Sequence, residues 1–221
     1  MHLETFQIPI LSDLIRYLLT FFADVTNSSG LAIIFLTIVI RLALYPLTLS
    51  QSKSMAQMRE LQPIQQELQK KYKDKPEEYQ RKVLELYQEH KVNPLGGCLP
   101  ILLQLPILWA LFGVLRTFPL DEAMFLGLNL AEAANEIGQW HGYVLPVLSG
   151  VTTYIQMALS ATAEPSQRMM MMIMPAFLVF VSLSFPGGLV LYWVVSNVFS
   201  IGQQYFINRQ LQAAKQEEGA S

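Results

Sequence analysis

Arg41 is a charged residue in an apolar stretch, and it needs water or polar partners around it more than any other residue of this sequence. It lies near the middle of residues 31–49, which read LAIIFLTIVIRLALYPLTL and are otherwise almost entirely apolar. A guanidinium at the centre of a bilayer costs about 2.5–3.5 kcal/mol on insertion scales. We therefore expect Arg41 to lie in a hydrated cavity, where a fixed cation attracts an acidic group carried by another molecule. The alternative is a purely structural arginine whose head group reaches toward the membrane surface.

The other polar side chains at the same depth are uncharged. Thr37 precedes Arg41 by one helical turn and shares its face. No Asp or Glu falls within any predicted span, so hydroxyls and amides are the partners that the chain itself offers to Arg41. The remaining candidates for a polar binding groove are Gln104, Gln156, Trp193, Ser196, Asn197 and Ser200.

Several of these candidates have a structural alternative. Hydroxyls such as those of Thr37, Ser196 and Ser200 often join helices inside a membrane without touching a ligand. Trp193 is about one turn from the outer end of its predicted span, where tryptophans anchor helices to the membrane interface. The methionines at 169–172 and 174 either face lipid or line a surface that adapts to varied apolar partners.

Enzymatic chemistry finds no support in the residue pattern. The sequence has no nucleophile–base pair, paired carboxylates or phosphate-binding loop at workable spacing. Its three histidines are far apart, and Cys98 is its only cysteine, so neither a metal site nor an internal disulfide is predicted. We expect no enzyme activity, no cofactor and no nucleotide use.

The composition indicates an all-α membrane protein. Hydrophobic residues make up 52% of the 221 residues and charged residues only 14%, against about 25% charged in soluble domains. The hydropathy pattern predicts five transmembrane helices, the first at residues 30–50 and the other four within residues 95–207. Those four are expected at 99–116, 143–161, 169–184 and 189–207.

The segments outside the spans have patterns of their own. Residues 1–29 place apolar side chains on one helical face, which predicts an amphipathic helix in the membrane interface or, alternatively, a packed helix. Residues 51–94 read as two amphipathic helices with a break before Pro76, which predicts a helical hairpin. Residues 117–142 read as a loop without basic residues, and residues 208–221 as a short polar tail.

The distribution of Lys and Arg orients the spans. Residues 51–94 hold nine of the fifteen basic residues, and Arg168, Arg209 and Lys215 fall on the same side of the predicted membrane. Basic residues favour the cytoplasmic side. The prediction is therefore an outside N-terminus, a cytoplasmic hairpin and a cytoplasmic C-terminus.

A set of motifs in a fixed order resembles the YidC/Oxa/Alb family of membrane protein insertases, from about residue 29 to residue 208. The first motifs are Thr37-x-x-x-Arg41-x-x-x-x-Pro46 and the stretch from Tyr87 through Asn93-Pro94-Leu95-Gly96-Gly97 to Pro100. The later ones are Gln104-Leu-Pro106, Met174-Pro175 and Phe185-Pro-x-Gly-Leu-x-Leu-Tyr-Trp193-x-x-Ser196-Asn197.

The resemblance implies a five-helix core around a hydrophilic groove that opens to the cytoplasm and laterally to lipid. It implies that Arg41 attracts acidic residues of a substrate, and that Thr37, Gln156 and Trp193 belong to groove or substrate-contact positions. It also implies a mobile hairpin that is needed for activity. Without a large extracytoplasmic domain or a long basic tail, the chain is expected to be a compact bacterial member.

The predicted function is insertion of hydrophobic segments into the bacterial plasma membrane. The expected partners are nascent membrane proteins and lipids, with the Sec translocon, a ribosome or a targeting receptor at the hairpin, and no nucleic acid directly. Two other classes stay open. One is a small-solute transporter or channel with Arg41 as counter-ion, and the other is an assembly factor that only scaffolds other membrane proteins.

Overall fold

The computed structural model of the chain is almost entirely helical, and it describes residues 9–90, 92, 99–118, 124–137, 140–160 and 165–220. The helices of the first half are α1 Pro9–Thr26, α2 Ser29–Ala43, α3 Tyr45–Glu60, α4 Gln62–Lys71 and α5 Pro76–Glu89. They are followed by α6 Leu99–Leu115, β1 Met124–Phe125, β2 Leu128–Asn129, α7 Ala134–Ile137, the 3₁₀ helix η3 Trp140–Tyr143, α8 Val144–Ser160, α9 Pro165–Ser182 and α10 Gly187–Ala220.

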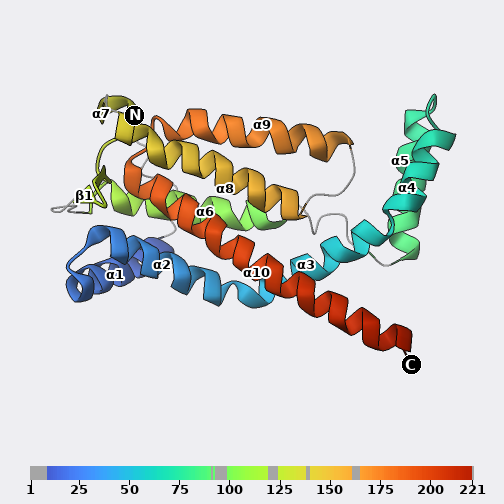
Figure 1. Cartoon of the computed structure of the whole chain (residues 1–221), viewed down its shortest axis with the longest axis horizontal. Helices are drawn as coiled ribbons and strands as arrows, with labels where there is room; N and C mark the ends of the chain where they lie inside the picture. Colours follow the sequence, from blue (N-terminus) through green and yellow to red (C-terminus); the bar gives the residue numbers. More distant parts are fainter. Residues whose placement is uncertain are drawn as a thin grey trace.

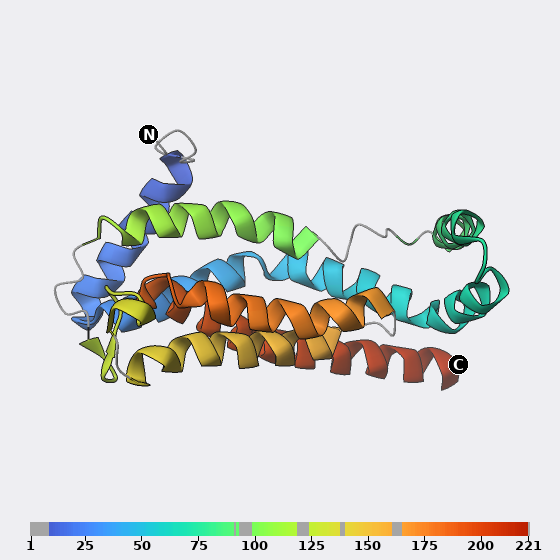
Figure 2. The ribbon, with the colours of Figure 1, turned by 90° about the horizontal axis from the view of Figure 1, so that it is seen from above.

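The long helices run lengthwise in one bundle (Figures 1 and 2). α8 packs between α9 and α10, and α10 also packs on α2. α1 crosses the end of the bundle that is remote from the helical hairpin, where it contacts both α2 and α6. The helical hairpin α4–α5 projects from the opposite end, on the side toward which the C-terminal part of α10 extends.

The predicted first span is not one straight helix. α2 ends at Ala43, and α3 begins at Tyr45 after a bend of 61°. Pro46 explains the break, because a proline has no N–H to continue the helical hydrogen bonds and its ring clashes with the preceding turn. Arg41 therefore lies in the last turn of α2, where the exposed carbonyls of a helix C-terminus favour a cation.

A membrane crossing requires a helix that is both long and apolar enough. Within the described ranges, no helix meets both requirements by itself, whereas α2 and α3 meet them together as a bent pair.

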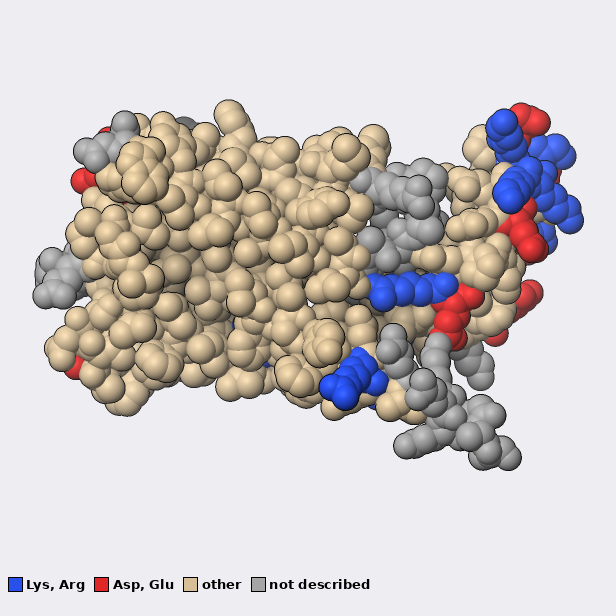
Figure 3. All heavy atoms as spheres, viewed as in Figure 1, with Lys and Arg blue, Asp and Glu red and all other residues tan. Residues whose placement is uncertain are grey.

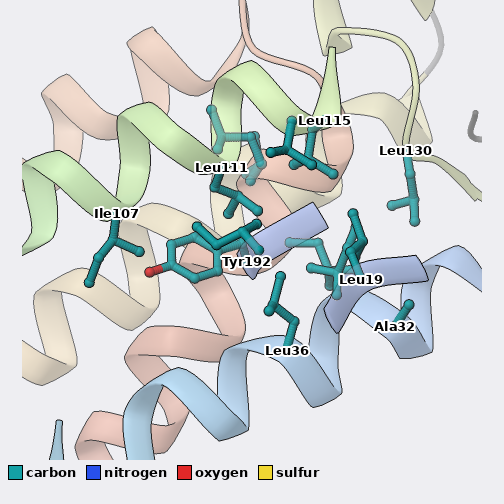
Figure 4. Packing of buried hydrophobic residues seen from close by; sticks show 14 of the residues in the cluster. Leu19, Ala32, Leu36, Ile107, Leu111, Leu115, Leu130 and Tyr192 are labelled. Atoms are coloured by element: carbon teal, nitrogen blue, oxygen red, sulfur yellow. The ribbon is translucent and has the colours of Figure 1, made fainter. Parts of the chain in front are cut away.

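The main apolar core lies in the half of the bundle remote from the helical hairpin. It joins Leu19 of α1, Leu36 of α2, Leu111 of α6 and Tyr192 of α10, all of which are buried (Figure 4). On α1, α2 and α6 such core positions recur at helical spacing, so each of these helices presents one apolar face to the centre, whereas α10 buries the four consecutive residues 189–192. The core ends near Arg41, since Ile40 is among the last residues of α2 to pack against it.

A small cap closes this end of the bundle; we use the name for residues 124–137. Its strands β1 and β2 pair antiparallel through a turn at Leu126 and Gly127, both at positive φ, which is the backbone of a tight two-residue hairpin. The cap joins the turn before α10 by backbone hydrogen bonds from Gly187 N to Glu132 O over 3.0 Å and from Gly188 N to Leu130 O over 2.8 Å. The segment predicted as a plain loop therefore contains two strands and two short helices.

The helical hairpin has a small core of its own. Leu61, Leu86, Tyr87 and Val92 are buried together, and α5 begins at Pro76 with Glu77 and Glu78 in its first turn, as a helix N-terminus favours. Most of the charged side chains on the visible face gather at this end of the molecule (Figure 3). Over the described ranges, the ion pairs lie within the hairpin, between Lys75 and Glu78 and from Glu85 to Arg81 and Lys82.

The end of the chain differs from its prediction. α10 does not stop at residue 207 but continues as one helix to Ala220. The residues after 207 include Gln, Leu, Ala and Lys, which are good helix formers, and no proline interrupts them. Of the motif that runs from Tyr87 to Pro100, residues 93–98 lie outside the described residues.

Candidate functional site: a polar seam between α2, α8 and α10

Arg41 contacts α10 across the bundle. Its Nε donates a hydrogen bond to Ser196 Oγ over 2.8 Å, and its Nη2 donates to the same oxygen. Ser196 is only 1% exposed, and Arg41 itself is half-buried. Across the described part of the chain, no carboxylate forms an ion pair with Arg41. The guanidinium is thus held by a neutral hydroxyl and keeps its full positive charge.

A second pair continues this contact toward α6. Gln104 Nε2 donates to the Tyr192 hydroxyl over 3.0 Å, and that hydroxyl also faces Ser196 and Arg41. Tyr192 is one turn before Ser196 on α10, so both point to the same side of the helix. Its ring packs into the apolar core while its oxygen reaches the core's edge (Figure 4). Tyr192 therefore marks the boundary between the apolar and the polar parts of the interior.

A third group of polar side chains joins α8 to α10. The Asn197 amide, with its nitrogen toward Gln156, donates to Gln156 Oε1 over 2.7 Å and accepts from the Thr153 hydroxyl over 2.8 Å. Trp193 Nε1 donates to Thr153 Oγ1 over 3.1 Å. Asn197 is buried, whereas Gln156 and Trp193 are half-buried. Gln156 and Trp193 are therefore the members of this group that keep accessible surface.

Thr37 bonds within its own helix, although its spacing of one turn from Arg41 favours a contact with the guanidinium. Its side chain is 0% exposed, and its hydroxyl donates to Ile33 O of its own helix over 2.6 Å. Ser200 likewise donates to the backbone, to Ser196 O over 2.9 Å. The hydrogen of each hydroxyl is satisfied within its own helix. Among the described contacts, Thr37 lies on the Arg41 face of α2 but forms no hydrogen bond with the guanidinium.

The site residues predicted from the sequence thus form three contacts, apart from Thr37 and Ser200, whose hydroxyls bond within their own helices. Arg41 binds Ser196, Gln104 binds Tyr192, and Gln156 meets Asn197 beside Trp193. Because Ser196 and Asn197 are consecutive on α10, one helix connects all three contacts. Sequence reasoning missed Tyr192 and the two threonines whose hydroxyls lie against the Asn197 amide oxygen, Thr152 at 3.1 Å and Thr153 at 2.8 Å. The four-residue spacing of Tyr192 and Ser196 was the signal for the first, and nothing in the sequence pointed to the two threonines.

A second half-buried cation lies closer to the helical hairpin. Arg59, in the last turn of α3, donates from Nη2 to Leu159 O over 2.6 Å, at the C-terminal end of α8. Burial lowers the pKa of the Arg59 guanidinium, while the negative end of the α8 dipole stabilises its charge. This contact ties the base of the hairpin to α8.

Comparison with known proteins identifies the family. Residues 21–216 match the family model described as the 60Kd inner membrane protein. The membrane protein insertase YidC of Fusobacterium nucleatum is 43% identical over 205 residues, which cover 90% of this chain and 97% of that protein. The chain belongs to the YidC/Oxa family of membrane protein insertases.

Other family members differ in length. The YidC of Geobacter sulfurreducens is 45% identical over 199 residues, which cover 89% of this chain but only 37% of that protein. A solved structure described as an active YidC insertase crystal structure with the first transmembrane domain resolved has a TM-score of 0.74 and 30% identity, covering 91% of this chain and 47% of that one. The chain thus spans less than half of these two relatives. The family description supports a bacterial inner-membrane location.

Removal of the Asn197 amide is expected to loosen the contact between α8 and α10. Asn197→Ala leaves Gln156 and Thr153 without this buried partner, and hydrogen bonds between membrane helices contribute about 0.6 kcal/mol each and at most about 1.7. We expect a loss of about 1–2 kcal/mol of stability, measured by thermal unfolding of the purified protein in detergent. Val198→Ala, at an exposed neighbouring position, is the matched control. An equal loss of stability in both variants would show that the Asn197 amide does not hold α8 and α10 together.

Proposed function

We propose that this chain inserts membrane proteins into the bacterial inner membrane. In this proposal α2, α6, α8, α9 and α10 are the membrane-crossing helices, and α1 lies in the outer interface. The helical hairpin and the end of α10 are cytoplasmic. The uneven distribution of basic residues supports the orientation, and membership of the insertase family supports the activity.

One observation carries the proposal: Arg41 is a half-buried cation that binds Ser196 and has no carboxylate partner in the described part of the chain. A fixed positive charge of this kind favours an acidic group brought in by a substrate. The polar residues beside it, including Gln104 and Gln156, supply donors and acceptors for water and for a polar flank. Together they form the proposed hydrophilic groove.

The proposed mechanism needs no covalent step and no cofactor. The hydrophilic flank of a nascent protein enters the groove from the cytoplasm and is held near Arg41. Its apolar segment meanwhile lies against the lipid-facing side, and its transfer into the hydrocarbon supplies the driving force. The groove shortens the distance over which the flank must travel through lipid. The helical hairpin, with its dense charges, is the proposed contact for the Sec translocon, a ribosome or a targeting receptor.

Site-specific crosslinking tests the proposal. A photoreactive residue at position 156 or 193 should crosslink to a ribosome-borne single-span protein in vesicles that contain the chain, whereas one at exposed position 180 on α9 should do so less. Phe180 is a suitable control because it lies on the outer face of the bundle, 72% exposed. Ion or solute flux that depends on Arg41 without any insertion would favour the transporter class instead. Crosslinking without insertion would favour a scaffold.

A further inference from the structure

The buried face of α10 changes from apolar to polar along the helix. Leu189 and Tyr192 are apolar core residues, and the positions that follow on the same side are Ser196, Ser200 and Gln203. Spacings of three and four residues keep these side chains in one stripe on a helix. Gln203 lies seven residues after Ser196, about 10 Å nearer the cytoplasmic end of the helix. The polar stripe therefore extends well beyond the contact of Ser196 with Arg41.

Gln203 is a buried amide without a protein partner. It is only 8% exposed, and neither its Nε2 nor its Oε1 forms a hydrogen bond with any described residue. Gln51 Nε2, on α3, is buried and unpaired in the same way. The bond from Ser52 Oγ to Gln204 Oε1, 3.0 Å long, shows that α3 and α10 touch at this level. Gln203 precedes Gln204 on α10 and therefore lies beside this contact.

An unpaired buried amide destabilises the fold, because its donor and acceptor are removed from water without compensation. A leucine of similar size would fill the same space without that cost. The position of Gln203 on the route from the cytoplasmic end to Arg41 suggests a reason for keeping the amide. It remains available to a ligand that passes along the polar stripe of α10, beside the contact of α10 with α3.

We infer that Gln203 is a subsite for the main chain of the incoming polypeptide, on the cytoplasmic side of Arg41. The amide of Gln203 offers one donor group and one acceptor, both unpaired, which match the C=O and N–H of an extended peptide. A lipid phosphate would accept from Nε2 but leave Oε1 unpaired. A peptide in a site of low polarity also gains most from such partners, since its own backbone groups are otherwise unsatisfied. This inference rests on the proposed insertase function.

Gln203→Leu separates a ligand-binding role from a structural one. We expect the variant, in vesicles supplied with a ribosome-borne single-span protein, to insert at least threefold less than the unaltered chain. Its melting temperature in detergent should be unchanged or higher, because an unpaired amide has been replaced by an apolar group. A photoreactive residue at position 203 should also crosslink to the hydrophilic flank of the arrested substrate. Phe206→Leu, at a position 64% exposed on the same helix, is the control and should leave both readouts unchanged.

The other outcomes overturn the inference. Unchanged insertion by Gln203→Leu would show that the amide does not bind substrate. A lower melting temperature with a parallel loss of insertion would show that it supports the fold, for example through bound water. In both cases the unaltered chain still inserts and still crosslinks at position 156, so the proposed function survives. If the unaltered chain neither inserts nor crosslinks, the proposed function itself fails.

Discussion

Arg41→Ala is expected to reduce about tenfold the insertion of substrates whose translocated flank carries acidic residues. A tenfold effect corresponds to about 1.4 kcal/mol. The attraction between two opposite unit charges 4 Å apart near a protein surface is larger, roughly 4 kcal/mol. The guanidinium has no carboxylate partner in the described part of the chain, so its loss removes the attraction without freeing an internal charge. The measurement is insertion into vesicles of paired substrates that differ only in flank charge.

The controls separate charge from shape. Arg41→Lys keeps the cation but loses the double contact of Nε and Nη2 with Ser196, and we expect it to retain most of the activity. Substrates with neutral flanks should be affected much less by Arg41→Ala. Raised ionic strength should narrow the difference between acidic and neutral flanks, because salt screens the attraction. Equal insertion of acidic flanks by Arg41→Ala and the unaltered chain would make Arg41 a structural residue only.

Local signals predicted much of the fold. The hydropathy pattern located the long apolar helices, and Pro76 with Glu77 and Glu78 predicted the start of α5 where the structure has it. The bend at Leu44 was missed because Pro46 lies within an apolar stretch that reads as one span. The continuation of α10 to Ala220 was missed because polarity was taken as the end of the helix, although polar residues such as Gln and Lys are good helix formers.

The candidate site was predicted as a set of residues but not as a set of contacts. Arg41 was identifiable from the energetic cost of a cation in an apolar stretch. Its partner Ser196 lies 155 residues away, and only the packing of α2 on α10 brings the two together. Thr37 had the right helical spacing to reach Arg41, yet its hydroxyl bonds to the backbone of its own helix. Spacing gives the face of a helix and leaves the choice of partner to tertiary packing.

The turn before α10 holds the cap against the end of the bundle that is remote from the helical hairpin. Gly187→Ala is expected to destabilise the protein by about 3 kcal/mol or more, since overpacking and lost backbone hydrogen bonds combine. A Cβ on Gly187 would lie far inside van der Waals distance of the Asn129 carbonyl oxygen, a backbone atom that cannot turn aside. The cap must therefore move away from the turn, which breaks the bonds of Gly187 and Gly188 to Glu132 and Leu130.

Two measurements identify this mechanism. Thermal unfolding in detergent gives the loss of stability, and faster hydrogen exchange of the amides of Gly187 and Gly188 would show that the cap has detached. Gly202→Ala is the matched control on the same helix, because a Cβ there meets nothing within 4 Å. That change should stabilise the helix by about 1 kcal/mol. If Gly187→Ala behaved like Gly202→Ala, the close approach of the cap would not stabilise this end of the bundle. The apolar core around Leu36 and Leu111 would then hold it alone.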